Sequence, residues 1–206
     1  MQELYFSFQQ TRRYYQSELE GKQHILIALH GYGQLAQFFF RKFTSLPDNW
    51  GVLVPEAPHR FYLEGSSGRV GASWMTKEWR HQDIAENNAF LSQLIVKIKE
   101  TYPLASLHLL GFSQGGATAA RLFQSIPTNF EQLILWASVF PPDIQKNDFP
   151  KGRKLHFVMG KQDPYFDSGQ QQNVLNEYRE LGFDGYSFDG GHDIETTTLL
   201  KMLQAD

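Results

Sequence analysis

Short apolar runs alternate with amphipathic segments along most of this chain. Most runs are rich in Val, Ile and Leu, as in strands covered on both faces, whereas the segments between them repeat apolar residues at helical spacing. Strands are expected at residues 24–29, 52–54, 107–110, 132–136, 155–159 and 183–188. Helices are expected at residues 34–46, 83–101, 117–125, 170–181 and 195–203. This alternation is typical of an α/β fold, with a mostly parallel central sheet and helices on both faces.

Two other regions add to this picture. Residues 4–8 and 13–18 are rich in Tyr and Phe and predict an antiparallel N-terminal strand pair at a sheet edge. Residues 56–77 mix Pro, Gly and Ser with aromatic residues and predict a long loop, of the kind that often binds ligands. No repeat, domain boundary or insertion long enough for a cap domain is visible. We therefore expect one domain over residues 1–206, with an open site.

Composition narrows the class of protein. The chain has no cysteine, which excludes disulfides, thiolate metal sites and a cysteine nucleophile. The net charge is −3 and no long basic cluster occurs, so we expect no nucleic-acid partner. No apolar run approaches the ~20 residues of a membrane helix, and the start lacks the pattern of a signal peptide. We expect a cytoplasmic protein without stable membrane insertion, and a homodimer is left open.

The candidate chemistry begins at Gly111-Phe112-Ser113-Gln114-Gly115-Gly116, between an expected strand and an expected helix. A Gly-x-Ser-x-Gly motif in this context is typical of a nucleophile elbow, in which the serine projects from a sharp turn and small neighbours let strand and helix close around it. The alternative is that Ser113 only caps the helix. The strand before and the helix after it favour the nucleophile.

A serine nucleophile needs a histidine base and a carboxylate that orients the base. His192 follows the last expected strand within Gly190-Gly191-His192-Asp193, whereas His156 lies inside a strand and is expected to be a structural residue. Asp163 follows the strand 155–159, which is where an α/β-hydrolase places its acid. The alternatives are Asp167, expected to begin a helix, Asp143 and Asp148, which follow the preceding strand, and Asp189 and Asp193, which flank His192.

Hydrolysis also needs two N–H donors for the oxyanion. One is expected from the backbone of Gln114, the residue after the nucleophile. The other is expected from Tyr32, in the loop His30-Gly31-Tyr32-Gly33 that follows the first parallel strand. His30 is expected to brace this loop rather than to take part in catalysis.

These pieces together resemble the phospholipase/carboxylesterase family of α/β-hydrolases, which includes acyl-protein thioesterases and small bacterial carboxylesterases. The matching segments are Leu29-His30-Gly31-Tyr32-Gly33, Pro55-Glu56-Ala57-Pro58, Ser73-Trp74 followed by Asp83-Ile84, the elbow, Asp163-Pro164 and Gly191-His192. The resemblance implies a minimal α/β-hydrolase fold without a cap, a metal-independent Ser-Asp-His triad without cofactors, and ester or thioester substrates. The aromatic N-terminus is more like the bacterial carboxylesterase branch.

The sequence therefore predicts a serine hydrolase that cleaves small-molecule carboxylic esters or acyl thioesters, carboxylesterase-like or lysophospholipase-like, through an acyl-enzyme. Trp74, Met75, Tyr165 and Phe166 are candidates for an apolar substrate wall, with ordinary core packing as the alternative. A peptidase of related fold and a catalytically silent binding module are the competing interpretations. All triad members are present, which favours the enzyme.

Overall fold

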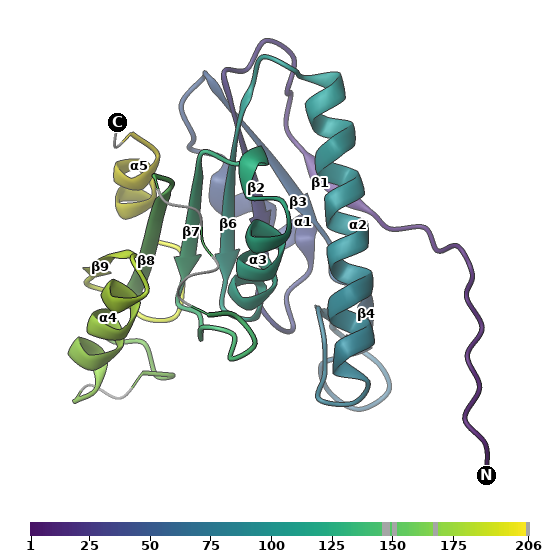
Figure 1. Cartoon of the computed structure of the whole chain (residues 1–206). Helices are drawn as coiled ribbons and strands as arrows, with labels where there is room; N and C mark the ends of the chain where they lie inside the picture. The colour runs from purple at the N-terminus through teal and green to yellow at the C-terminus, as the bar shows by residue number, and fades with distance from the viewer. Residues whose placement is uncertain (146–148, 150–151, 167–168, 205–206) are drawn as a thin grey trace.

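A seven-stranded twisted sheet forms the centre of the molecule (Figure 1). The computed structural model describes residues 1–145, 149, 152–166 and 169–204. The strand order is β1-β3-β2-β6-β7-β8-β9, and all neighbours are parallel except β1 and β3. The strands are β1 (Tyr14–Gln16), β2 (His24–Leu29), β3 (Trp50–Pro55), β6 (Ser106–Phe112), β7 (Gln132–Trp136), β8 (Lys154–Gly160) and β9 (Asp184–Phe188).

Helices cover both faces of this sheet, so the inner strands are buried on both sides. One face packs against α2 (Arg80–Thr101), α3 (Gln114–Ser125) and α4 (Gln171–Glu180). The other packs against α1 (Ala36–Phe39), the 3₁₀ helix η1 (Phe40–Phe43) and α5 (Thr196–Gln204). A short 3₁₀ turn, η2 (Pro127–Asn129), leads into β7. The expected α/β fold is confirmed, and no cap domain occurs in the described residues.

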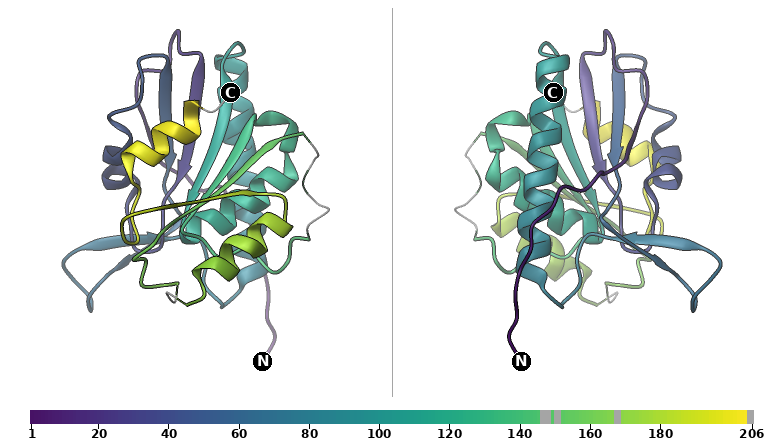
Figure 2. Two further views of the ribbon diagram at one scale, coloured as in Figure 1. Left: turned by 90° about the vertical axis from the view of Figure 1, so that its left-hand side faces the viewer. Right: turned by 90° about the vertical axis from the view of Figure 1, so that its right-hand side faces the viewer.

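The region 56–77 is not one long loop, as the sequence analysis expected. It contains an antiparallel hairpin of β4 (His59–Tyr62) and β5 (Val70–Ser73), which projects from the body of the molecule (Figure 2). Gln34 bridges to Ala72, which ties the hairpin to the loop after β2. The hairpin thus lies beside the carboxyl end of the sheet and not within it.

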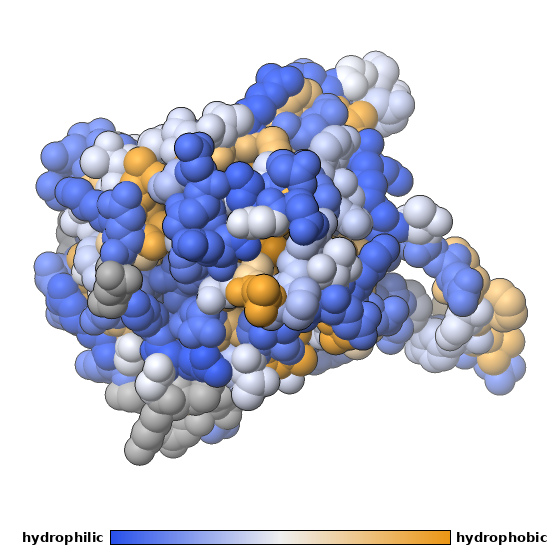
Figure 3. All heavy atoms as spheres, turned by 90° about the horizontal axis from the view of Figure 1, so that it is seen from above, coloured by the Kyte–Doolittle hydropathy of each residue, from blue (hydrophilic) through white to orange (hydrophobic). Residues whose placement is uncertain are grey.

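The N-terminal strand pair also differs from the sequence prediction. Tyr14–Gln16 is a strand at the sheet edge, but its antiparallel partner is β3. Residues 4–8 form no strand; they run as an extended arm away from the body (Figures 1 and 3). Their Tyr and Phe content favours a strand, but no strand in the described residues pairs with them.

The expected 34–46 helix is also shorter than its pattern, because it ends as a 3₁₀ turn at Phe43. Within the described ranges, no helix has the combination of length and apolarity that crossing a bilayer requires.

Candidate active site

Ser113 lies on a strained turn between β6 and α3. Its φ of 54° and ψ of −120° are rare for a residue with a side chain, and such a conformation costs on the order of 1–3 kcal/mol. The Ser113 N–H donates to the carbonyl of Trp136 (2.8 Å), and its own carbonyl accepts from Gly116 (2.9 Å). This is the strand–turn–helix geometry of a nucleophile elbow, as the sequence predicts.

Glycine at position 115 lets the elbow close against the neighbouring strand. A β-carbon on Gly115 would overlap the backbone carbonyl oxygens of Leu29 and His30. The loop after β2 is equally close at Gly31, where an added β-carbon would lie 3.0 Å from the Phe112 ring and 3.2 Å from the Ser113 β-carbon. The loop after β2 therefore lies directly against the serine.

Asp163 and His192 are joined across the loops that follow β8 and β9. His192 Nδ1 lies 2.7 Å from Asp163 Oδ2, and the Asp163 side chain is fully buried. The other carboxylate oxygen accepts from the N–H of Tyr165 (3.0 Å). Both oxygens of this buried carboxylate are therefore engaged by donors, as a buried charge requires. The ring of His192 contacts that of Phe112, with centroids 4.8 Å apart, which places the imidazole beside the elbow.

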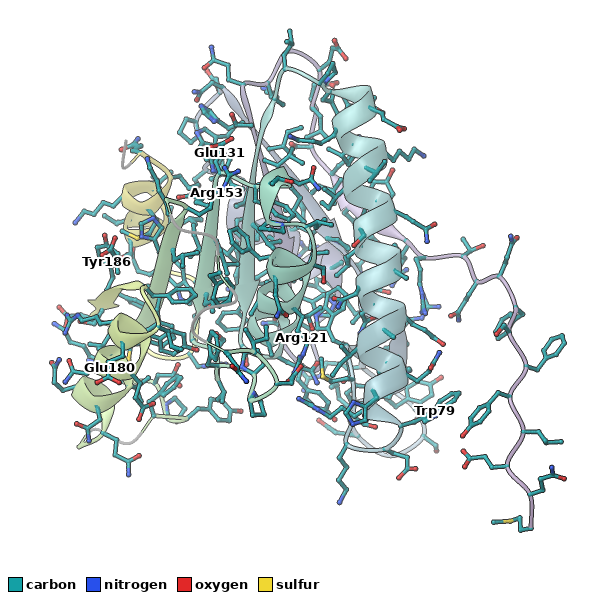
Figure 4. All side chains as sticks on the ribbon, viewed as in Figure 1. Trp79, Arg121, Glu131, Arg153, Glu180 and Tyr186 are labelled. Carbon is teal, nitrogen blue, oxygen red and sulfur yellow. The ribbon has the colours of Figure 1, made fainter. Side chains whose placement is uncertain are left out.

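The alternative acids that the structure describes have other partners. Asp143 receives two hydrogen bonds from the buried guanidinium of Arg121, which hold the pKa of that carboxyl below its usual range. Figure 4 labels Arg121 on α3. Asp189 pairs with Lys161 (2.8 Å) and Asp193 with Lys42 (2.6 Å). Asp148 and Asp167 lie outside the described residues.

His30 braces the loop that carries Tyr32, as the sequence analysis expected. It is fully buried, its Nε2 accepts from the N–H of Ala57 (3.0 Å), and its Nδ1 lies 2.8 Å from the carbonyl of Gly31. Burial lowers the pKa of His30 to about 4, so the ring is neutral at neutral pH and Nδ1 carries the proton. A neutral ring that both donates and accepts fixes the loop without adding charge.

The backbone N–H groups of Tyr32 and Gln114 donate to no other group in the described part of the chain. Both belong to the two backbone segments that meet at Ser113. The N–H of Gln114 also lies at the start of α3, where the helix dipole favours negative charge. These two amides could thus stabilise an oxyanion next to the serine.

The side chain of Gln114 has a structural role that the sequence analysis missed. Its Oε1 accepts from the N–H of Trp74 (2.9 Å), and its Nε2 donates to the carbonyl of Met75 (2.8 Å). Trp74 Nε1 in turn donates to the carbonyl of His30 (2.8 Å). The segment after β5 is thereby fastened to both backbone segments at the site. Ser73-Trp74 is one of the segments that carry the family resemblance, but the sequence spacing does not predict its contact with Gln114.

The four candidates for an apolar wall separate into two kinds. Trp74 is fully buried and Met75 is 5% exposed, so both pack inside the fold and present little surface to a substrate. Tyr165 is 77% exposed, and its ring centroid lies 4.6 Å from that of His192. Phe166 is partly buried against the core. Only Tyr165 among them offers open surface beside the histidine.

A cavity of about 560 Å³ opens between α1, the loop after β2 and the tip of the β4–β5 hairpin. Its lining is mostly apolar and comprises Gly33, Gln34, Leu35, Phe38, Phe39, Lys42, Leu63, Arg69 and Val70. Gly33 directly follows Tyr32, and Lys42 pairs with Asp193, the neighbour of His192. The cavity thus adjoins the proposed oxyanion loop. Sequence analysis missed it because the hairpin that forms one wall was read as an irregular loop.

His156 is buried on β8, outside the site, as expected. Neither ring nitrogen has a hydrogen-bond partner among the described residues, and burial lowers the pKa of His156. No cluster of three or more metal-ligating side chains occurs in the same residues.

Comparison with known proteins decides the family. A family model described as serine hydrolase (FSH1) matches residues 19–201 of the chain. The chain belongs to this serine hydrolase family. The match spans the elbow, the loop after β2, Asp163 and His192. The resemblance to small α/β-hydrolases is therefore confirmed at the level of a serine hydrolase.

Solved structures share the fold of this serine hydrolase at low sequence identity. Esterase PE8 is 17% identical with a TM-score of 0.70, over 94% of this chain and 97% of its own. Acyl-protein thioesterase 2 of Zea mays is 20% identical with a TM-score of 0.69, over 93% and 97%. A carboxylesterase of Mesorhizobium loti is 15% identical with a TM-score of 0.71, over 90% of each chain. No curated protein sequence matches.

Proposed function

We propose that this serine hydrolase cleaves carboxylic esters or acyl thioesters, with Ser113 as nucleophile, His192 as base and Asp163 as the orienting acid. The observation that carries the proposal is the buried Asp163–His192 hydrogen bond of 2.7 Å, with the His192 ring against Phe112, the residue before a serine whose φ is 54°. A strained serine at a strand–helix turn next to a carboxylate-bound imidazole is the arrangement that acyl transfer requires.

The Asp163 contact sets which nitrogen of His192 is basic. Because Nδ1 donates to the carboxylate, the lone pair lies on Nε2, which can remove the Ser113 hydroxyl proton. The Ser113 oxygen then attacks the acyl carbon and forms a tetrahedral adduct. Its oxyanion accepts from the N–H groups of Tyr32 and Gln114, which have no other acceptor among the described residues.

The same imidazole completes the cycle. Protonated His192 gives its proton to the departing alcohol or thiol, the bond from the acyl carbon to the leaving group breaks, and the acyl-serine ester remains. A water then loses a proton to His192 and attacks this ester. The second adduct collapses, Ser113 recovers its proton and the carboxylic acid leaves.

The apolar cavity supports a substrate with an apolar acyl or alcohol portion. Its 560 Å³ falls within the size range of small-molecule sites, and its lining includes Gly33, the residue after Tyr32. The structural neighbours named as an esterase, an acyl-protein thioesterase and a carboxylesterase support the same reaction class.

Covalent labelling with a fluorophosphonate tests the proposal. The wild type is expected to be labelled and Ser113→Ala is expected to lose the label and hydrolysis of p-nitrophenyl esters and acyl thioesters. Ser106→Ala is the matched control, because Ser106 lies at the other end of β6. Equal labelling of wild type and Ser113→Ala would exclude Ser113 as the nucleophile. A labelled wild type that turns over no ester or thioester would exclude the substrate class.

A further inference from the structure

An extended arm, residues 1–11, precedes the sheet and carries a row of exposed apolar side chains. Leu4, Phe6 and Phe8 are 77%, 91% and 75% exposed, and they alternate along the arm. Tyr5 points the other way: its ring stacks on that of Trp79, with centroids 5.7 Å apart and an interplanar angle of 13°. Figure 4 labels Trp79 at the start of α2, near the arm. Because successive side chains of an extended segment face opposite sides, the row lies on the side of the arm opposite Tyr5.

The body of the molecule does not cover this arm. A cavity of about 1310 Å³ separates residues 5–12 from α2, and its lining includes Phe90, Leu94 and Lys97. No backbone hydrogen bond links residues 4–8 to another described segment. The composition favours a strand, and the exposed N–H and C=O groups of residues 4–8 pair with no strand of the described residues, which leaves this edge open to another strand.

We propose that the arm pairs with the arm of a second copy of this chain, as two antiparallel strands related by a twofold axis at Ser7. In this register Phe6 of each copy faces Phe8 of the other, on the same side of the ribbon. Aromatic cross-strand pairs of this kind stabilise antiparallel strands. A twofold axis makes the contact self-complementary and closed, so the assembly stops at a dimer.

Charge along the arm favours the antiparallel direction. Glu3 lies near one end, and Arg12 directly follows the other, whereas Arg13 is paired with Glu56 of its own chain. Antiparallel pairing brings the acidic end of each arm toward the basic end of its mate, whereas parallel pairing would set like charges side by side. An anionic lipid surface would repel Glu3 at the acidic end of the arm.

The size of the contact predicts a reversible dimer. Phe6 and Phe8 of each arm bury about 150–250 Å² each when covered, whereas Tyr5 lies on the opposite side against Trp79. The four phenylalanine side chains give about 600–1000 Å², which is the size of a weak, reversible interface. We therefore expect the fraction of dimer to rise with protein concentration.

Sedimentation equilibrium of the full chain over a range of concentrations tests the proposal. The double variant Phe6→Ser/Phe8→Ser is expected to raise the dimer dissociation constant by about tenfold or more. Leu104→Ser is the matched control. Leu104 is 97% exposed and lies outside the arm, so its substitution should leave the dimer unchanged. A wild type that stays monomeric at every concentration would overturn the proposal. So would monomeric protein that sediments with anionic vesicles, which would assign the arm to a lipid surface.

The register is tested by a single cysteine, since the chain has none of its own. Directly opposed residues of antiparallel strands have Cα atoms about 4.5–5.5 Å apart, which suits a disulfide. Ser7→Cys is expected to form a covalent dimer under mild oxidation much faster than Leu104→Cys. Equal rates would contradict the twofold axis at Ser7. Neither experiment depends on hydrolysis, so their outcome is separate from that of the proposed reaction.

Discussion

At the scale of single residues, the site depends on side chains whose partners come from distant loops. Asp163 could be predicted because it follows a recognisable strand in the order that α/β-hydrolases use, and the structure places it 2.7 Å from His192. The side chain of Gln114 could not, because its partners Trp74 and Met75 lie 40 and 39 positions away. Contacts at that separation follow from the packing of loops, which leaves no periodic signal.

Replacing Asp163 by asparagine tests the residue-scale assignment. The amide keeps the size of the side chain but loses the charge that stabilises the His192 imidazolium, and it no longer fixes the proton on Nδ1. We expect kcat for ester hydrolysis to fall by about 10³–10⁴ with little change in KM. Asp189→Asn is the control, because Asp189 pairs with Lys161 on the surface. A fall in kcat of less than about tenfold in Asp163→Asn would assign the acid to another residue.

At the scale of elements, the sequence predicts those strands best that are covered on both faces. The bounds of β2 and β7 agree with their apolar runs because every residue after the first of β2, and all of β7, is buried. The β4–β5 hairpin escaped prediction because its strands lie outside the central sheet and pair with each other, apart from an isolated bridge between Ala72 and Gln34. The residues of β4 are mostly exposed, so burial imposes no pattern on them.

The close packing of α3 against the loop after β2 is the element-scale feature on which the site depends. A methyl group in Gly115→Ala would meet the carbonyl oxygens of Leu29 and His30, and backbone atoms there cannot move without shifting the loop. We expect about 1–3 kcal/mol of destabilisation from overpacking. We also expect kcat to fall by about 10²–10³, as when one oxyanion donor is misplaced.

Gly21→Ala separates these two effects. Gly21 has a φ of 70° and no atom within 4 Å of an added β-carbon, so the substitution strains the backbone far from the site. A cost of about 1 kcal/mol in unfolding free energy with unchanged kcat is expected. If Gly115→Ala were equally active once folded, the distance between α3 and the loop after β2 would not control the reaction.

At the scale of the whole molecule, buried neutral histidines make stability depend on pH. His30 and His108 are 0% and 8% exposed, and burial lowers their pKa values to about 4 and about 3. His108 lies at the opposite end of the sheet from the site, in the first half of β6, where its Nε2 is 3.2 Å from His24 Nδ1. Nearby positive charge from His24 and Lys154 lowers the pKa of His108 further. His30 at one end of the sheet and His108 at the other therefore stay unprotonated at pH values at which a histidine of the unfolded chain binds a proton.

The sign of the pH effect follows from this difference. A histidine in the unfolded chain titrates near 6.5, so below that pH the unfolded state binds protons that folded His30 and His108 refuse. Their contribution to the free energy of unfolding is complete above about pH 6.5 and is lost as the pH falls toward the folded pKa values. At pH 5 each should have lost about 2 kcal/mol relative to neutral pH.

Urea unfolding at pH 7.5 and pH 5.0 measures this loss. His108→Gln keeps a polar side chain that does not titrate, so the difference in unfolding free energy between the two pH values should shrink by about 2 kcal/mol. His81→Gln removes an exposed histidine from α2 and should leave the difference unchanged. The comparison within each variant cancels any stability that the substitution itself adds or removes, because that change is common to both pH values. An undiminished difference in His108→Gln would mean that His108 takes up its proton without unfolding, through an opening at the amino end of β6.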